Sequence, residues 1–268
     1  KCLDMPRFKL TIEYDGTRYS GWQIQKGGKS VQGEILDACR DLFGEAVTDL
    51  YGAGRTDSGV HAIGQTAHLD VKTDLPALRI RYGLNDRLPS DICIVNVEDA
   101  AQGFHARHDA IARSYLYQIS RRRPALGKKY VWWIKDQHDV KKMNEVAGYF
   151  TGLKNFKSFT DPDQEQGSSK VEILHSSVTV HGDMIIFHVI GSHFLWKQVR
   201  RMTGVLVEAG RGKISVSDVI SFFRNRSDVP AKLTAPPSGL FLDKVYYRND
   251  TILYSAKPVI DLRSCGTT

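Results

Sequence analysis

The order of predicted secondary-structure elements repeats once along this 268-residue chain. Strands are predicted where apolar and polar residues alternate, and helices where apolar residues recur every three or four positions. The first half is predicted to hold strands at residues 8–14, 65–71 and 92–97, with helices at 30–44 and 76–87. The second is predicted to hold strands at 111–120, 130–134, 171–180, 184–190 and 240–246, with helices at 140–150, 195–210 and 217–223. This pattern predicts a duplicated α+β fold.

We expect the halves to meet near residue 108, giving an N-terminal half of residues 1–108 and a C-terminal half of residues 109–268. After about residue 248 the sequence carries no clear pattern, so this tail either packs on the body or is partly disordered. The polar stretch 161–169 is predicted to be a mobile loop. Met5 is an alternative natural start, which would make residues 1–4 an addition.

The charge balance is basic, with 37 Lys and Arg against 30 Asp and Glu, so that 37 − 30 = +7, and the pI is near 9.2. Such an excess favours a polyanionic partner such as a nucleic acid, the alternative being a protein that carries spare lysines. No apolar run approaches the roughly 20 residues that cross a bilayer, and the first residues do not form a signal peptide. The composition therefore predicts a soluble protein with no membrane contact.

The cysteines and histidines indicate neither disulfides nor a metal site. The four cysteines lack any C-x-x-C spacing, so they are expected to be free thiols in a reducing cytoplasm. His105 and His108 stand three apart, and His61 and His68 seven apart, without companion ligands nearby. We therefore expect no zinc site.

The segment 52–61 is the most informative stretch for chemistry. Arg55 and Asp57 are two residues apart, so in an extended segment their side chains lie on the same side. A neighbouring arginine favours the ionised aspartate and lowers its pKa. The surrounding glycines allow a bulky ligand to approach, and a charged, oriented carboxylate can act as a nucleophile. The alternative is a structural aspartate that caps a turn, with Arg55 as an ordinary surface partner.

Residues 54–61, Gly-Arg-Thr-Asp-Ser-Gly-Val-His, resemble the signature of the TruA family of tRNA pseudouridine synthases. Ser58 stands where that family usually has Ala, a change between small residues. Other segments resemble further family motifs in the same order along the chain: 13–23, 30–32, 104–107, 113–117, 194–200 and 235–240. The resemblance therefore covers nearly the whole chain.

This resemblance implies a tRNA pseudouridine synthase that isomerises uridine to pseudouridine at positions 38, 39 and 40 of the tRNA anticodon stem-loop. Nothing is added or removed in that reaction, so no cofactor is needed. The family resemblance also implies a homodimer in which one tRNA touches both subunits. It implies an α+β fold of two RRM-like halves, with a joined, mainly antiparallel sheet around a central basic cleft.

The resemblance also assigns roles to individual residues. Asp57 matches the nucleophile, which attacks either the ribose C1′ or the base C6. Tyr115 matches a tyrosine that stacks on the flipped base or assists at it, and without the resemblance the sequence favours a core tyrosine. Arg200 matches the partner of the aspartate, a choice that helical periodicity alone does not make between it and Arg201. Arg55 is expected to help displace or replace the flipped base, since a base in a duplex must leave its stack before reaction.

Two further features concern substrate binding. Leu240 matches an apolar residue that lines the family's pocket, or it is a plain strand core residue. The turn 121–129 holds five basic residues and no acid, so it is either a phosphate-binding track or a solvated hairpin tip. These predicted RNA-binding residues are Arg121, Arg122, Arg123, Lys128 and Lys129.

Three other functions compete with this one. A non-catalytic RNA-binding protein would have no use for a buried nucleophile. A phosphotransferase with an aspartyl-phosphate intermediate needs an acidic cluster for magnesium, and none surrounds Asp57 in the sequence. A pseudouridine synthase with other target positions stays open, because the choice of position lies in shape rather than in a short code.

Overall fold

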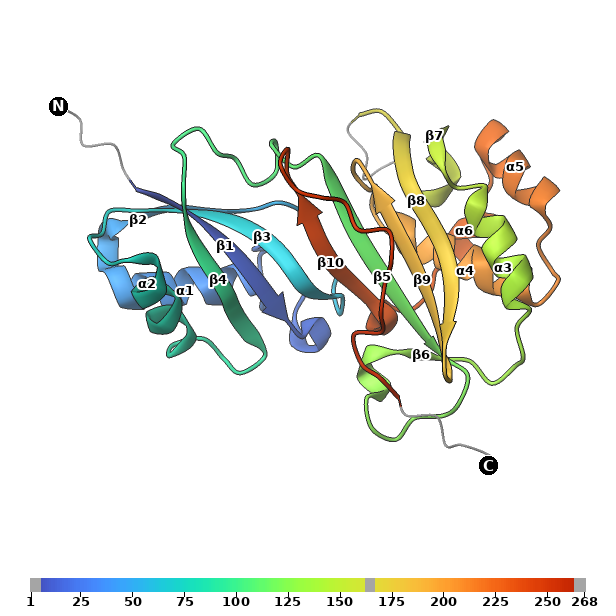
Figure 1. Cartoon of the computed structure of the whole chain (residues 1–268), viewed down its shortest axis with the longest axis horizontal. Coiled ribbons are helices and arrows are strands. Elements are labelled where there is room, and N and C mark those ends of the chain that lie inside the picture. The colour runs from blue at the N-terminus through green and yellow to red at the C-terminus, as the bar shows by residue number, and fades with distance from the viewer. Residues whose placement is uncertain (1–5, 162–166, 263–268) are drawn as a thin grey trace. The chain divides into compact units, whose positions relative to one another are not determined.

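A computed structural model describes residues 6–161 and 167–262, which form two compact units (Figure 1). The first unit comprises Lys1–Ile111 and Phe241–Asp250, and the second comprises Ala112–Leu240 and Thr251–Thr268. The chain is α+β, and the sheet of each unit is mainly antiparallel. The boundary near residue 108, the RRM likeness and a joined sheet around a basic cleft stay predictions. Residues 1–4 and most of the predicted 161–169 loop lie outside the described residues.

The first unit has the β-α-β-β-α-β order of a ferredoxin-like fold. Its elements are β1 (Arg7–Tyr14), α1 (Val31–Phe43), β2 (Val47–Gly52), β3 (His61–Val71), α2 (Ala77–Asn85), β4 (Ile92–Ala100) and most of β10 (Leu240–Tyr246). Strand β1 lies between β4 and β3 and is antiparallel to both, with Leu10 opposite Ala67 and Val97. Strand β2 is antiparallel to β3, and β10 runs parallel to its first residues.

The two faces of the first sheet have different environments, because successive side chains of a strand point to opposite sides. Leu10 and Ile12 are fully buried on the side that α1 and α2 cover. On the other side, the chain segment before β5 covers the sheet. There the Ala106 N–H donates to His68 Nδ1 at 3.1 Å, and the Tyr247 hydroxyl donates to the Ala106 carbonyl at 2.8 Å. On this side of β1, Lys9 is half-buried and Glu13 is exposed, so this face is only partly covered.

The second unit also combines an antiparallel sheet with helices. Its elements are β5 (Ala112–Ser120), β6 (Trp132–Trp133), α3 (Val140–Gly148), β7 (Gly152–Asn155), β8 (Lys170–His181), β9 (Met184–Gly191), α4 (Gln198–Gly210), α5 (Val216–Arg224) and α6 (Val229–Lys232). The strand order is β5-β9-β8-β7, all antiparallel, and β6 runs parallel to the end of β5. A cluster of phenylalanines, including Phe150, Phe159 and Phe187, fills the space between the sheet and the helices.

The side of the second sheet away from that cluster carries polar residues. Ser114, Gln118 and His188 are all buried there. The C-terminal segment, residues 251–262, covers this face, and it is drawn in red in Figure 1. The tail is therefore packed on the body as far as residue 262, which favours the first of the two alternatives for it.

Short 3₁₀ helices connect several elements: Gly16–Arg18, Gly44–Ala46, Lys128–Tyr130, Lys157–Phe159 and Pro237–Gly239. The predicted start of α1 is confirmed, because the Ser30 hydroxyl accepts from the Gly33 N–H at 3.2 Å. Its predicted end is confirmed at Gly44, which has φ +62°. Within the described residues no helix is long and apolar enough to span a bilayer.

Several predicted element bounds are wrong. The strand expected at 130–134 is only Trp132–Trp133, since a 3₁₀ turn occupies the residues before it. Strand β3 begins at His61 rather than at residue 65, because β10 pairs with its first residues from far along the chain. Helix α4 begins at Gln198 rather than at residue 195, because Lys197 adopts a left-handed conformation with φ +57°. Strands β2 and β7 were not expected.

The two cysteines in the described part of the chain, Cys39 and Cys93, are free thiols, as predicted. Burial raises the pKa of Cys39 to about 12, so this thiol stays protonated and behaves as a small apolar core residue. Cys2 and Cys265 lie outside the described residues.

Candidate active site

Asp57 lies in the connection between β2 and β3, in the first unit. The Val60 N–H donates to the Asp57 carbonyl at 3.1 Å and closes a tight turn, in which Gly59 has φ +77°. Asp57 itself is half-buried. Arg55 is exposed and forms no ion pair within residues 6–161 and 167–262, so the pair expected with Asp57 is not formed.

Two aromatic residues of the opening segment hold the backbone next to Asp57. The hydroxyls of Tyr14 and Thr56 are hydrogen-bonded at 2.8 Å and are buried. The backbone N–H of Trp22 donates to the Thr56 carbonyl at 3.2 Å. The Trp22 ring fills the space above Gly52, where a Cβ atom would lie 2.5 Å from the ring. A larger residue than glycine at position 52 would therefore displace the tryptophan.

The other side of the loop is held by Tyr19. Its carbonyl accepts from the Gly59 N–H at 3.3 Å and from the Ser58 hydroxyl at 3.2 Å. Its own hydroxyl donates to Asp91 at 2.6 Å, and Arg18 binds the same carboxylate at 2.7 Å. Burial raises the pKa of Asp91, but the hydrogen bonds from Tyr19 and Arg18 outweigh it and leave the pKa below its ordinary value. The ionised form therefore anchors Tyr19.

Gly16 and His61 fix the end of the same loop. A Cβ on Gly16 would lie 1.9 Å from the Val60 carbonyl oxygen, so only glycine allows this approach. The Gly16 N–H donates to Nδ1 of the buried His61 at 3.0 Å. The Asp57 loop is thus immobilised on three sides, which is the pre-organisation that a catalytic carboxylate needs.

Sequence reasoning gave Tyr14, Tyr19 and Trp22 no role of their own. They belong to the 13–23 segment, whose resemblance to a family motif was the available signal that it acts together with the Asp57 loop. The periodicity of β1 indicated only which of its residues are buried.

Replacing Tyr14 by Phe removes the hydroxyl partner of Thr56 without changing the ring. We expect the free energy of unfolding of the first unit to fall by about 1 kcal/mol, the usual net value of one hydrogen bond. Hydrogen exchange at the amides of residues 56–60 should become faster. Tyr82→Phe is the matched control, because Tyr82 is half-exposed on α2. Equal stability and exchange in the two variants would contradict a role for the Tyr14–Thr56 bond.

Tyr115 lies on β5, in the second unit, and shares a face with Tyr117, as predicted. This is the face toward the helices rather than the face that the C-terminal segment covers. The Tyr115 ring is 8% exposed and meets the edge of Phe194 at 5.1 Å between ring centroids. Tyr115 is therefore mostly buried but keeps a small accessible surface.

Arg200 and Arg201 are distinguished by the structure of α4. The Arg200 Nε donates to the Ala235 carbonyl at 2.8 Å, and the Ala235 N–H donates to the Arg200 carbonyl at 3.1 Å. Arg201 is 7% exposed and lies 6.0 Å from the centroid of the Trp196 ring. Arg200 is thus tied to the segment that leads to Leu240, while Arg201 packs against an aromatic ring.

The segment 235–240 is docked against β5. The Tyr117 hydroxyl donates to the Pro236 carbonyl at 2.7 Å. Burial raises the pKa of Tyr117 well above its ordinary value, and the charge of Arg200 lowers it less, so the hydroxyl remains a donor. A Cβ on Gly239 would lie 2.6 Å from the Tyr117 ring. Leu240 follows directly and is 5% exposed.

The predicted site residues therefore fall in two groups. Asp57 and Arg55 belong to the first unit, and Tyr115, Arg200 and Leu240 belong to the second. Within the second unit, β5, α4 and the 235–240 segment are joined by the contacts of Tyr117 and Arg200. That Asp57 lies close to the residues of the second group stays a prediction.

The basic turn, residues 121–129, belongs to the second unit. Arg121 donates to the Gly182 carbonyl, and Arg122 lies 3.3 Å from the Asp183 carboxylate, so both side chains contact the β8–β9 turn. Arg123 lies over the Trp133 ring at 5.7 Å from its centroid. Arg123, Lys128 and Lys129 are exposed. These three are better placed than Arg122, whose charge Asp183 balances, to contact phosphates.

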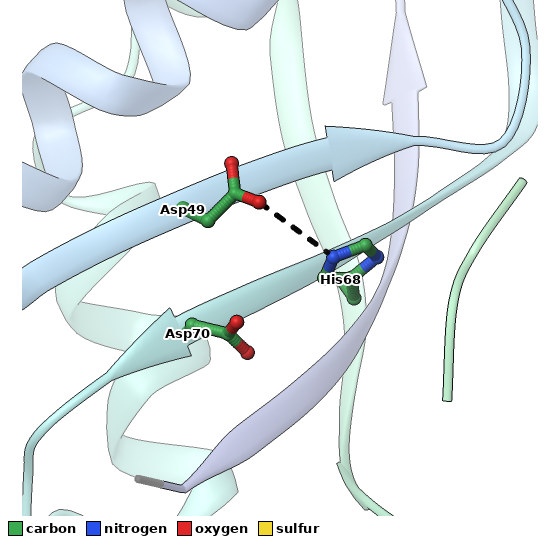
Figure 2. A group of neighbouring side chains, drawn as sticks. All are labelled: Asp49, His68 and Asp70. Carbon is green, nitrogen blue, oxygen red and sulfur yellow. Dashed lines mark ion pairs between the residues drawn. The ribbon is translucent and has the colours of Figure 1, made fainter. Parts of the chain in front are cut away.

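One group of acidic and histidine side chains is close enough together to suggest a metal site. Figure 2 shows Asp49 on β2 with His68 and Asp70 on β3, and their ligand atoms lie within 4.8 Å of one another. However, Arg7 already binds both oxygens of Asp70 at 2.6 Å. His68 Nδ1 accepts from the Ala106 N–H, so the proton of the neutral ring is on Nε2, the atom that faces Asp49. A protonated Nε2, 4.0 Å from the Asp49 carboxylate, cannot ligate a cation, so this arrangement does not favour a metal site.

A second histidine cluster, in the second unit, gives a pH dependence. Burial and, to a smaller extent, the neighbouring His175 lower the pKa of His188 to about 4, against a smaller opposing effect of the Tyr254 backbone. The unfolded chain protonates this residue below about 6.5. Between pH 6.5 and 4 the unfolded state therefore binds more protons, so stability falls as the pH falls. The difference corresponds to about 3 kcal/mol.

We therefore expect the free energy of unfolding of the second unit to fall more steeply between pH 7 and 4 in the wild type than in His188→Gln. Urea unfolding at each pH measures this. His108→Gln is the control, because His108 is exposed and lies in the first unit. A His188→Gln profile that runs parallel to the wild-type profile would exclude His188 as the cause.

Residues of both units match the same protein family. The sequence model of a family described as tRNA pseudouridine synthase matches residues 10–109 and 146–248. The tRNA pseudouridine synthase A of Rhodopseudomonas palustris is 42% identical over 246 residues, which cover 91% of this chain and all of that protein. The enzyme of the same name from Agrobacterium fabrum is 40% identical over 263 residues, with 96% and 98% coverage. The matched ranges include Asp57, Arg200 and Leu240.

Solved structures give only a remote likeness. A Cbf5-Nop10-Gar1 complex aligns with a TM-score of 0.33 and 8% identity, over 75% of this chain and 45% of that one. A TM-score this low carries no argument about function.

Proposed function

Since the chain belongs to the tRNA pseudouridine synthase family, we propose that it isomerises uridine to pseudouridine at positions 38, 39 and 40 of the tRNA anticodon stem-loop. The family makes the chain an isomerase that acts on tRNA. The positions come from the TruA resemblance of the sequence, which runs in order from residue 13 to residue 240.

In this reaction the bond between uridine N1 and ribose C1′ breaks, and a bond between C5 and C1′ forms. The proton on C5 leaves, and N1 gains one. No atom is added to the nucleotide or removed from it, so neither a cofactor nor a redox partner is required. The protein has to hold the flipped base, supply a nucleophile and move a proton.

We assign the nucleophile to Asp57, which attacks either ribose C1′ or base C6. The observation that carries this assignment is the immobilised loop in which Asp57 stands. Its neighbour Thr56 is fixed by Tyr14 and Trp22, and its turn by Tyr19. Because the loop is already held in place, it does not have to rearrange to present its carboxylate when the reaction occurs.

The second unit supplies three of the remaining groups in this proposal, and the first unit supplies Arg55. Tyr115 stacks on the flipped base or assists removal of the C5 proton, and Arg200 pairs with Asp57. Leu240 lines the pocket, and Arg55 helps to displace the base from its stack. The ties of Arg200 to Ala235 support this assignment, because they orient the guanidinium from the same segment that positions Leu240.

The test is tritium release from tRNA that carries 5-tritiated uridine, followed by mapping of pseudouridine in the product. We expect release to equal the number of uridines at positions 38–40. A transcript with cytidine at all three positions should release none. Release from that transcript would show other target positions, and no release from either tRNA would contradict the proposed activity.

The same family implies a cytoplasmic homodimer that touches one tRNA with both subunits, and we include this in the proposal. Light scattering of the purified protein with and without tRNA measures the assembly. We expect a mass of two chains, and two chains with one tRNA in the complex. A monomer at micromolar concentration that is fully active would contradict the dimer.

A further inference from the structure

We propose that the C-terminal segment 251–262, hereafter the strap, sets the conformation of the basic turn and thereby the affinity for tRNA. This inference rests on the proposed function, because it takes tRNA as the ligand of the turn. The match to the family model ends at residue 248, before the strap begins. The red segment in Figure 1 shows its path across the second unit.

The strap is joined to the basic turn through Gln118, a fully buried residue of β5. The side-chain carbonyl of Gln118 accepts from the N–H groups of Val259 at 2.6 Å and Ile260 at 3.3 Å. Its side-chain amide donates to the Tyr130 carbonyl at 3.0 Å. One buried amide therefore satisfies backbone groups of the strap and of the residue that follows the turn.

An apolar contact joins the same two segments. A Cβ on Gly127 would lie 3.5 Å from the Leu262 side chain and 3.6 Å from the Ile260 side chain, so both pack against this residue. Gly127 has φ +75° and begins the 3₁₀ helix Lys128–Tyr130. The strap thus contacts the hinge from which Lys128 and Lys129 extend.

These contacts matter for binding because an unsupported basic turn would have to be ordered when RNA binds. Ordering a loop and its long side chains costs conformational entropy, which lowers affinity. A turn that the strap already holds presents Lys128 and Lys129 in one arrangement. Loss of the strap contacts should therefore weaken binding without changing the chemical step.

The strap's other end offers a matched control. The Tyr254 ring lies 5.5 Å from the His175 ring and is 56% exposed. Within the described part of the chain Tyr254 contacts His175 and not the turn, so Tyr254→Ala loosens the strap away from Gln118. Comparison with this variant separates an effect on the turn from a general loss of packing.

The experiment measures the tRNA Kd, kcat and KM of wild type, Gln118→Met, Leu262→Ala and Tyr254→Ala, well below their unfolding temperatures. We expect the first two variants to raise Kd and KM about tenfold, with kcat at saturating tRNA within about twofold of wild type. Tyr254→Ala should bind as wild type does. Unchanged Kd in both Gln118→Met and Leu262→Ala would overturn the proposal, as would an equal loss of affinity in Tyr254→Ala.

A double-mutant cycle tests whether the strap acts through the lysines. Lys128→Gln/Lys129→Gln should weaken binding and lower the salt dependence of Kd. In the variant that combines Gln118→Met with this pair, the total fold-increase in Kd should be smaller than the product of the two separate fold-increases. Effects that multiply in full would overturn the proposal. If the lysine variant binds tRNA weakly but the strap variants bind it normally, this inference is rejected and the proposed function is not. If the wild type neither binds tRNA nor has activity, the proposed function is rejected as well.

Discussion

Asp57→Asn is expected to reduce pseudouridine formation by at least about 10⁴-fold, the scale seen when a nucleophile is removed from an enzyme. Asparagine has nearly the size of aspartate but lacks the negative charge, so it cannot attack C1′ or C6. The loop should keep its structure, because the hydrogen bonds of Thr56, Ser58, Gly59 and the Asp57 backbone remain available in the variant. Tritium release measures activity, and a filter-binding assay measures tRNA affinity.

The control for this prediction is Asp74→Asn, which removes one negative charge from an exposed position of the same unit. It should have wild-type activity. The Asp57→Asn variant should bind tRNA within about threefold of wild type and unfold at the same temperature, since each change in charge is small against the phosphate contacts. Activity of Asp57→Asn within tenfold of wild type would reject Asp57 as the nucleophile.

Local chemistry made part of this structure predictable. Ser30 and Gly44 mark the ends of α1 because a hydroxyl satisfies an orphan N–H group and glycine tolerates positive φ. The alternation in β1 indicated its buried face for a similar reason. Such features depend on neighbours within a few residues, and these are visible in the sequence.

Contacts between distant segments were not predictable in this way. Periodicity left Arg200 and Arg201 equivalent, and the difference between them depends on Ala235 and Trp196. Ala235 reaches α4 only through the packing of the whole second unit. The resemblance to a family was therefore the only sequence-based reason to choose Arg200.

The segments that cover the sheet faces could not be predicted from the sequence either. An RRM binds RNA by stacking bases on aromatic residues of its open sheet face. Here the corresponding face of the first unit is covered by the segment around Ala106 and by Tyr247, and that of the second by the strap. Tyr115 instead lies on the helix side of its sheet. The predicted RRM likeness therefore does not by itself imply the RRM mode of binding.

The close approach of α4 to the segment before Leu240 depends on a single glycine. A Cβ on Gly204 would lie 1.7 Å from the Leu233 carbonyl oxygen and 2.6 Å from its carbonyl carbon. Both are backbone atoms, which cannot rotate away as a side chain can. Any larger residue must push the segment off the helix, and this segment holds Ala235, the hydrogen-bond partner of Arg200.

Gly204→Ala is therefore expected to destabilise the second unit by about 3 kcal/mol, at the upper end of the cost of overpacking a core. This outweighs the gain of about 1 kcal/mol that alanine brings to a helix interior. The unfolding temperature should fall by about 6–12 °C, measured by calorimetry. The kcat/KM for tRNA should also fall, because Arg200 loses its fixed orientation.

Gly148→Ala is the matched control, since Gly148 ends α3 and a Cβ there would meet no atom within 4 Å. This variant should unfold at the wild-type temperature or slightly above it. If Gly204→Ala also unfolds at the wild-type temperature, the segment before Leu240 can move away from α4 without loss of stability. Its contact with α4 then does not orient Arg200. If Gly204→Ala is destabilised but keeps full kcat/KM, the contact contributes to stability, and Arg200 is positioned by other means.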